Sequence, residues 1–177
     1  LDIEGDYSNA AYFFAAAAIC KGKVKVTNLK IDSAQGDKFF VEALEKMGCE
    51  VNYGSDFIEI EGKELNGLGE IDMNNYPDIV MPLAVVASFA KGETKFTNIA
   101  HLSIKESDRL QVTIDELSKL GVEISGDDES ITIIGNPEKE LNGGIIDSHN
   151  DHRVVMSFAV AGLKVKEITI ENEEAVG

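Results

Sequence analysis

The sequence contains few cysteines, prolines and basic residues, and each shortage excludes a class of protein. Two cysteines in 177 residues are too few for a small fold held by disulfides, so we expect Cys20 and Cys49 to be buried or half-buried thiols in a reducing compartment. The longest apolar run, residues 10–20, is too short to span a bilayer. With three prolines and no low-complexity segment, the chain shows no linker between domains.

Basic residues are outnumbered, because 16 Lys and Arg stand against 32 Asp and Glu and give a formal net charge of −16. A charge this negative argues against nonspecific binding to nucleic acid or to an anionic membrane, although it leaves room for a local cationic pocket. Only two of the basic residues are arginines. Arg109 and Arg153 both have acidic neighbours in the chain, which makes them candidates for a specific site.

Apolar residues make up 44% of the chain, which is enough to bury a core, and we interpret residues 1–177 as a single domain. The sequence begins at Leu1 rather than at a methionine, and its first residues do not have the pattern of a signal peptide. We therefore expect a piece of a longer protein that is soluble and cytoplasmic.

The clearest pattern in the sequence is an internal repeat. Three segments recur in the same order at offsets of 70, 73 and 73 residues: 21–29 as 91–99, 44–51 as 117–124, and 57–62 as 130–135. Matching segments at nearly one offset indicate two copies of one structural unit. A third, incomplete copy starts near Gly144.

The periodicity within each copy predicts the order β-α-β-α-β-β. The expected opening strands are residues 1–4, 70–73 and 144–147, the apolar helices 8–20, 77–90 and 151–163, and the next strands 24–29, 94–99 and 167–170. In the two complete units an amphipathic helix then ends at Gly48 or Gly121, and a two-stranded hairpin follows. The fold class is therefore α/β, with two complete units and a partial third packed around inner helices.

The inner helices are expected to begin at matching places, near Ser8, Asp78 and His152. The N-terminus of a helix offers free N–H groups and the positive end of its dipole, so three that converge would bind anions. Arg109 and Arg153 would add the bidentate donors that suit phosphate and carboxylate groups.

Several candidates also have a purely structural explanation, and the residues alone leave both open. Asp78 follows a proline, so it is equally an ordinary first-turn acid. Ser103 and Glu106 have the spacing of a capping box, and a helix that begins there would carry Lys105 and Arg109 on one face. The acids beside the two arginines could form ordinary surface pairs.

Five strings, in this order, resemble the family of 5-enolpyruvylshikimate-3-phosphate synthases over essentially the whole chain. They are Gly5-Asp-Tyr-Ser-Asn-Ala-Ala-Tyr-Phe13, Gln35-Gly-Asp37, Pro77-Asp78, Lys105-Glu-Ser-Asp-Arg-Leu110 and Asn150-Asp-His-Arg153. The last two are specific as a pair, and the first is weaker. The resemblance implies most of the C-terminal domain of a two-domain enzyme whose domains each contain three such units, with the N-terminal domain absent.

The reaction implied by the resemblance transfers the enolpyruvyl group of phosphoenolpyruvate to the 5-hydroxyl of shikimate 3-phosphate and releases phosphate. It belongs to the shikimate pathway of aromatic amino-acid biosynthesis. The chemistry needs a base at the hydroxyl, an acid at the methylene carbon, and cations for a carboxylate and for phosphates. No metal or organic cofactor is implied.

The same resemblance implies roles for individual residues. Asp78 contacts the 5-hydroxyl as base or positioning group, and Glu106 protonates the methylene carbon and later removes that proton. Lys105 lies between the two substrates. Arg109 and Arg153 bind the carboxylate and the phosphate of phosphoenolpyruvate.

Three further residues belong to the implied substrate site. His152 and Asp151 support the phosphoenolpyruvate site, with Asp151 orienting an arginine. His101 stands where an asparagine that contacts the shikimate phosphate is common in the family, so the sequence departs from the pattern there. The family also has a phosphoenolpyruvate-binding lysine just after the glycine that matches Gly177, and the sequence stops at that glycine.

Two other functions stay open on the sequence alone: transfer of the enolpyruvyl group to a UDP-sugar, which the two specific strings argue against, and a non-catalytic domain of the same fold. The isolated chain is expected to be inactive, because half of the site would be missing. Its exposed inner face predicts weak self-association. Replacing either arginine by lysine should weaken phosphoenolpyruvate use and leave folding intact, because lysine lacks the bidentate fork.

Overall fold

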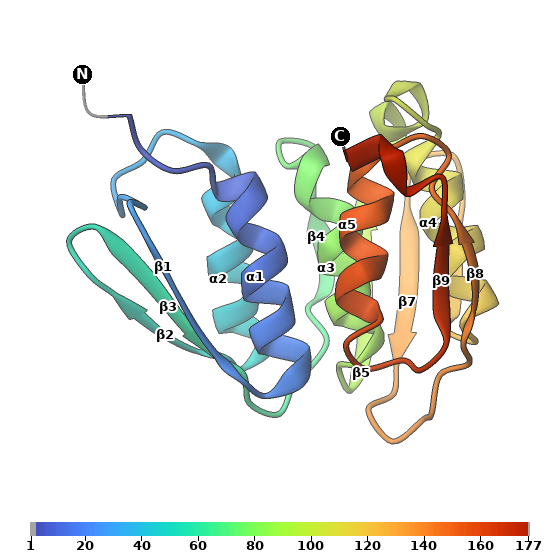
Figure 1. The fold of residues 1–177 in the computed structure, drawn as a ribbon, viewed down its shortest axis with the longest axis horizontal. Coiled ribbons are helices and arrows are strands. Elements are labelled where there is room, and N and C mark those ends of the chain that lie inside the picture. Colours follow the sequence, from blue (N-terminus) through green and yellow to red (C-terminus); the bar gives the residue numbers. More distant parts are fainter. Residues whose placement is uncertain (1–2, 177) are drawn as a thin grey trace.

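Three helices lie side by side at the centre of the computed structural model, which describes residues 3–176 (Figure 1). They are α1 (Tyr7–Cys20), α3 (Val80–Ser88) and α5 (His152–Ala161), and each packs against the other two. All nine residues of α3 are buried. These helices are apolar on most of their faces, which is why they form the interior layer.

The first sheet lies beside α1 and has the strand order β1-β3-β2, with both pairs antiparallel. Its elements are β1 (Lys23–Thr27), the 3-10 turn η1 (Gly36–Lys38), α2 (Phe39–Met47), β2 (Glu50–Tyr53) and β3 (Phe57–Glu61). Helix α2 packs on α1, so α1 is covered by this sheet and by this helix. The hairpin between β2 and β3 was predicted from the sequence.

The second sheet has the order β4-β5-β7-β6, in which β4 and β5 are parallel and the other pairs antiparallel. Its elements are β4 (Gly69–Asp72), η2 (Pro77–Ile79), α3, β5 (Gly92–Thr97), η3 (Ala100–Ile104), α4 (Arg109–Lys119), β6 (Glu123–Gly126) and β7 (Ile131–Gly135). Strands β8 (Gly144–Asp147) and β9 (Ile168–Glu171) form a parallel pair around α5, and η4 (Glu173–Val176) follows.

The parallel pairs decide where the inner helices begin. Strands β4 and β5 are joined through α3, and β8 and β9 through α5, so each helix starts beyond the carboxyl end of the strand before it. The starts of α3 and α5 therefore lie at the same end of the molecule as the start of α1 (Figure 1). The predicted mixed α/β fold is confirmed.

Helix α2 shows how the apolar pattern produces the packing. Phe40, Ala43, Leu44 and Met47 point inward and are buried, as their spacing predicts. The helix ends at Gly48, whose φ of +119° is open to glycine, and a Cβ there would lie 2.6 Å from the carbonyl oxygen of the chain at residue 64.

The predicted strand over residues 1–4 is wrong for the part that the structure describes. Ile3 and Glu4 are not in a strand, and the rest of that prediction lies outside the described residues. The backbone N–H of Gly5 donates to the carbonyl oxygen of Asn28 at 2.6 Å, but Asn28 has left β1 with a φ of +62°. Its side-chain amide donates to the carbonyl oxygen of Ile3 at 3.1 Å, so a side chain takes the place of a ladder partner.

Two smaller predictions also change. Cys20 is exposed at the last residue of α1 rather than buried, whereas Cys49 is buried as expected, and both are free thiols. The apolar helix expected from residue 77 opens as the 3-10 turn η2, because Pro82 has no N–H to donate to the carbonyl of Asp78 four residues earlier. Within residues 3–176, no helix is long and apolar enough to cross a membrane.

Candidate functional site

The candidate site lies at the end of the molecule where α1, α3 and α5 begin (Figure 1). The side chain of Asp6 accepts hydrogen bonds from the first turn of α1, and that of Asp151 accepts one from the backbone N–H of Arg153 at 2.9 Å. Both are N-caps, which explains why these helices start where they do. The turn η2 leads into α3 and places Asp78 at the same end.

Arg109 is the centre of the site. It is the first residue of α4 and only 2% exposed, and carboxylates from three elements surround it. Its Nε and Nη2 donate to the two oxygens of Asp151 at 2.8 and 3.2 Å. Its Nη1 donates to Asp78 Oδ1 at 3.0 Å, and its Nη2 to Glu106 Oε2 at 2.5 Å. These bonds use all but one of its five N–H groups, and the remaining one is on Nη1.

The buried pair of Arg109 and Asp151 is held in its charged form. Burial raises the pKa of Asp151, but hydrogen bonds from the Arg109 guanidinium and from the backbone N–H of Arg153 outweigh burial and hold the pKa below its ordinary value. Burial lowers the pKa of Arg109, and the surrounding carboxylates, Asp151 first, more than offset it. Removing one partner of an ion pair this deeply buried strongly destabilises the folded protein, because the other charge is left buried without a partner.

Arg153 lies next to this cluster with most of its donors unused. Its side chain is 12% exposed, and its Nη2 forms an ion pair with Asp78 Oδ2 at 3.2 Å. Its Nη1 donates to the hydroxyl of Tyr12 at 3.2 Å. Its Nε is buried and has no hydrogen-bond partner among residues 3–176. Arg153 therefore has far more capacity than Arg109 to bind an added anion.

The acids differ in their access to solvent. The side chains of Asp78 and Glu106 are 35% and 52% exposed, while that of Asp151 is fully buried. His152 is 39% exposed, and its Nδ1 lies 3.8 Å from Asp151 Oδ1. Asp78 and Glu106 can therefore touch a ligand directly, whereas Asp151 acts on a ligand only through the arginine that it holds.

Tyr12 and Asp37 belong to this region, although the sequence assigned neither a role. Asp37 accepts a hydrogen bond from the hydroxyl of Ser8, at the start of α1. Burial raises the pKa of Asp37, and the nearby charges of Asp78 and Arg153 act on it in opposite directions. Both residues belong to strings that carry the family resemblance, and this membership is the sequence feature that could have identified them as site residues.

Lys105 is placed differently from the sequence prediction. It lies at the end of η3 and is exposed, so it does not share a helix face with Arg109. Helix α4 starts only at Arg109, because the side chain of Asp108 caps it by accepting from the backbone N–H of Gln111 at 3.1 Å. Lys105 directly precedes Glu106 in the chain and so stays at this end of the molecule.

The start of α4 also decides between the two explanations of Glu106. The capping box expected from Ser103 to Glu106 is wrong, since Ser103 Oγ donates to the carbonyl oxygen of Ala100 at 2.7 Å and Asp108 is the actual cap. Glu106 instead contacts Arg109. Asp78 is a first-turn acid of η2, as its position after a proline predicts. It also contacts both arginines, so the structural and the functional explanation both apply.

Within residues 3–176, no hydrogen bond or ion pair joins His101 to the cluster of Asp78, Glu106, Arg109, Asp151, His152 and Arg153. His101 lies on η3 and is half-buried, and its Nε2 is buried with no hydrogen-bond partner in the described part of the chain. Along that same part, no group of three His, Cys, Asp or Glu side chains has the arrangement to hold a metal ion. The acids at this end converge on a guanidinium.

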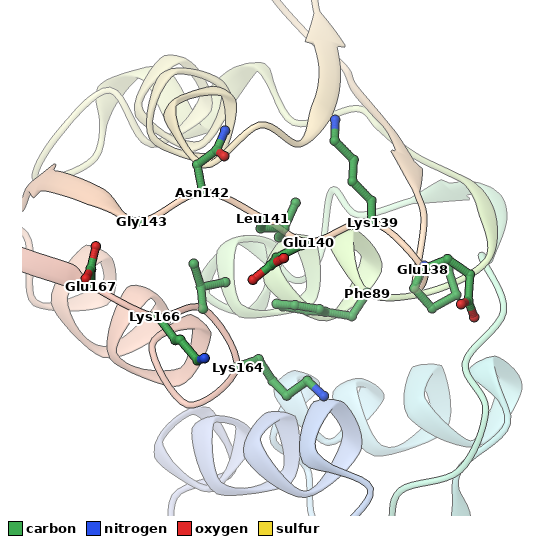
Figure 2. A pocket seen from close by; sticks show the side chains of 12 residues that line it. Phe89, Glu138, Lys139, Glu140, Leu141, Asn142, Gly143, Lys164, Lys166 and Glu167 are labelled. Carbon is green, nitrogen blue, oxygen red and sulfur yellow. The ribbon is translucent and has the colours of Figure 1, made fainter.

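A cavity of about 650 Å³ lies at the opposite end of the inner helices, where α3 and α5 finish (Figure 2). Its lining includes Phe89, Leu141 and both lysines that follow α5, Lys164 and Lys166. Figure 2 shows two acidic side chains of the loop after β7, Glu138 and Glu140, across the cavity from these lysines. Lysines near helix C-termini stabilise the negative ends of the helix dipoles, which accounts for the charge there without a ligand.

The family model described as EPSP synthase (3-phosphoshikimate 1-carboxyvinyltransferase) matches residues 1–177. The chain belongs to the EPSP synthase family. It is 50% identical over 176 residues to a 3-phosphoshikimate 1-carboxyvinyltransferase of Methanosphaerula palustris, covering 99% of this chain and 41% of the relative. It is 45% identical over 168 residues to that of Haemophilus influenzae, covering 95% of this chain and 38% of the relative.

Solved EPSP synthases have the same fold as this family member. A structure of EPSP synthase from Acinetobacter baumannii superposes with a TM-score of 0.85 at 31% identity, covering 98% of this chain and 43% of that one. A second from the same organism has a TM-score of 0.83 at 30% identity, over 98% of this chain and 42% of that one. The chain thus spans about two fifths of the length of the relatives it matches.

Proposed function

We propose that this chain supplies one side of the active site of an enzyme that transfers the enolpyruvyl group of phosphoenolpyruvate to the 5-hydroxyl of shikimate 3-phosphate and releases phosphate. The observation that carries the proposal is the convergence of Asp78 and Glu106, both solvent-accessible, on the buried guanidinium of Arg109. A reaction that moves a proton at an oxygen and another at a carbon needs two such acids at fixed positions.

Each acid takes one proton-transfer step. Asp78 accepts a hydrogen bond from the acceptor 5-hydroxyl and orients or deprotonates it. Glu106 gives a proton to the methylene carbon of phosphoenolpyruvate and removes one when phosphate leaves. Arg109 fixes the two carboxylates relative to each other, because it bonds to both while Asp151 holds it from the buried side. Lys105, exposed beside Glu106, is positioned to contact an anion between the two substrates.

The two arginines divide the work of anion binding. Arg153 is the principal ligand of the phosphoenolpyruvate carboxylate or phosphate, since most of its N–H groups are uncommitted. Arg109 adds the one N–H that its carboxylates leave on Nη1. His152 and the starts of the inner helices contribute positive charge or N–H donors around them. His101 contacts the shikimate phosphate from η3.

The chain is most of the C-terminal half of a two-domain enzyme, and the rest of the protein supplies the other substrate contacts. The match over about two fifths of the relatives' length supports this division. The 177 residues alone are then inactive. They associate weakly through an inner face that includes Ile104, which is 82% exposed beside the cluster. The two free thiols support a reducing, cytoplasmic location.

The experiment uses the full-length protein that contains this chain and follows the release of phosphate from phosphoenolpyruvate and shikimate 3-phosphate. Glu106→Gln and Asp78→Asn should each lower kcat at least about a hundredfold, because each removes a proton-transfer group. Glu138→Gln changes the charge equally at the far cavity and should leave kcat within about twofold. If both site variants retained the parent's turnover, the chain would be a non-catalytic domain and the proposal would fail.

A further inference from the structure

Glu116 is a buried acid that the reaction does not use. It lies on α4, about two turns after Arg109 and so on the same side of the helix, and is only 1% exposed. Its two oxygens accept from Lys119 Nζ, both at 2.8 Å, and its Oε1 lies 3.3 Å from His149 Nε2. Because a carboxylate accepts and does not donate, Nε2 carries the proton in this contact. Burying a carboxylate costs free energy unless it is paired and hydrogen-bonded, so the residues that contact Glu116 indicate its structural role.

His149 belongs to a turn with an unfavourable backbone. It and Asn150 both have positive φ, at 51° and 54°. Positive φ at the two central residues is the pattern of a type I′ turn, which glycine fills without strain, while asparagine and histidine fill it less readily than glycine but more often than most other residues. The turn closes when the backbone N–H of Asp151 donates to the carbonyl oxygen of Ser148 at 2.9 Å.

The turn leads directly into the substrate-binding string. Asp151 is both the N-cap of α5 and the partner of Arg109, and the next two residues are His152 and Arg153. On one side the turn is fixed by Asp147, which accepts from the backbone N–H of His149 at 2.8 Å, and by Ser148 Oγ, which donates to Asn172 at 2.9 Å. Two contacts join the turn to α4: Arg109 donates to Asp151 at the end of the turn, and His149 Nε2 lies 3.3 Å from Glu116 Oε1 near its start.

We propose that Glu116 and His149 form a positioning pair, which anchors the start of the 148–151 turn to α4 and, together with the Arg109–Asp151 pair at its end, sets the place of His152 and Arg153 in the phosphoenolpyruvate site. The inference rests on the proposed function for its kinetic consequence. It explains why a histidine stands where a glycine would relieve the backbone: the side chain is needed to reach the buried acid. Misplacement of a binding group by a fraction of an ångström weakens the use of its ligand.

The decisive variant is His149→Gly in the full-length protein, because it relieves the positive φ and removes the contact with Glu116. If the residue serves only the backbone, the variant should be at least as stable as the parent and kinetically unchanged. If the pair positions the site, the KM for phosphoenolpyruvate should rise about tenfold while that for shikimate 3-phosphate changes less than about twofold. A general loss of folded protein would lower kcat and leave both KM values alone.

Matched controls separate the contact from the strain. Asn150→Gly relieves the same kind of strain one residue later and keeps the contact with Glu116, so both KM values should stay within about twofold. Glu116→Gln should raise the KM for phosphoenolpyruvate in the parent but not in the His149→Gly background, because the pair acts as a unit. Additive effects of the two substitutions, or an unchanged KM in folded His149→Gly, would overturn the proposal.

A second readout needs no activity. Hydrogen exchange at the amides of Asp151 and Arg153, both hydrogen-bonded in the parent, should quicken about tenfold in His149→Gly and not in Asn150→Gly. If the unsubstituted protein does not turn over phosphoenolpyruvate, the proposed function is wrong, but the exchange rates of the two variants can still be compared. Unchanged exchange in His149→Gly would remove the positioning pair whatever the parent's activity.

Discussion

Arg109 and Asp151 lie 42 residues apart in the chain and hold each other by two hydrogen bonds in the interior, with Nε–Oδ2 at 2.8 Å and Nη2–Oδ1 at 3.2 Å. Neither side chain is more than 2% exposed. The pair joins the start of α4 to the start of α5, which come from different units. The end of the molecule that carries Asp78 and Glu106 is therefore organised around a buried ion pair.

Removing the charge of Asp151 should destabilise the fold in a pH-dependent way. The pKa of Asp151 is lowered in the folded chain, so its contribution is complete above the ordinary aspartate pKa of about 4 and is lost as the pH falls through the lower folded value. Asp151→Asn, which keeps a capping side chain, should lower the free energy of unfolding by about 1.5–3 kcal/mol at pH 7.

Urea unfolding at several pH values checks this. The gap between the parent and Asp151→Asn should narrow below about pH 4, since the unfolded parent then takes up a proton at Asp151 that the folded parent, with its lower pKa, does not. Asp127→Asn, at an exposed hairpin tip whose pKa is also lowered by its hydrogen bonds, should cost much less at pH 7 because its side chain faces water. A gap for Asp151→Asn that stays constant to pH 2 would contradict the assignment.

The two arginines should respond differently to lysine, because the Arg109 guanidinium is paired with the buried Asp151 and that of Arg153 is not. We therefore revise, for Arg109, the sequence-based expectation that both substitutions leave folding intact. Arg109→Lys cannot bridge three carboxylates and leaves Asp151 buried without its bidentate partner, so we expect about 3–5 kcal/mol of destabilisation. Arg153→Lys should keep the melting temperature within about 3 °C and raise the KM for phosphoenolpyruvate about tenfold or more. Equal melting temperatures for the two variants would contradict this.

Tyr12 should contribute to the same substrate step by holding Arg153. Tyr12→Phe removes the hydroxyl that accepts from Arg153 Nη1, so the KM for phosphoenolpyruvate should rise about three- to tenfold with little change in kcat. Tyr7→Phe is the control, because it removes a comparable hydrogen bond from a buried tyrosine, here to the carbonyl of Lys30. Similar kinetics for the two variants would mean that Tyr12 has only a packing role.

Weak self-association of the 177-residue chain should appear in sedimentation velocity at rising concentration. Because the net charge is −16, raising the salt concentration should strengthen it by screening repulsion between copies. Ile104→Asn should weaken it, while Ile145→Asn, on β8 and 58% exposed, should not. A strictly monomeric chain at high concentration and high salt would rule out an adhesive inner face.

Sequence periodicity predicted most of the fold, because the buried faces of α2 and α4 and the alternating strands are local patterns. It failed where a single side chain decided the outcome. Asn28 turns away from β1 and occupies the carbonyl of Ile3, so the opening strand does not form. Asp108 rather than Ser103 caps α4, and the competition between two capping candidates five residues apart is not visible in a spacing rule.

The candidate site residues could be named from the sequence, but not their arrangement. The resemblance implies that Asp151 orients an arginine, but the sequence does not say which one, and the acids next to each arginine in the chain allow ordinary surface pairs. Arg109 is in fact committed to carboxylates that include Asp151 and Asp78, which are 42 and 31 residues away in the chain. Long-range pairing of this kind follows from the packing of α3, α4 and α5, so it appears only once the fold is built. Tyr12 escaped notice because it lies in an apolar run.

The proposed function can be tested by giving the full-length protein phosphoenolpyruvate and two competing acceptors, shikimate 3-phosphate and a UDP-sugar, and by measuring both products and the released phosphate. We predict that shikimate 3-phosphate alone is converted to its 5-enolpyruvyl product, with one phosphate released for each, and that Glu106→Gln abolishes the conversion. Enolpyruvyl transfer to the UDP-sugar, or full conversion of shikimate 3-phosphate by Glu106→Gln, would contradict this prediction.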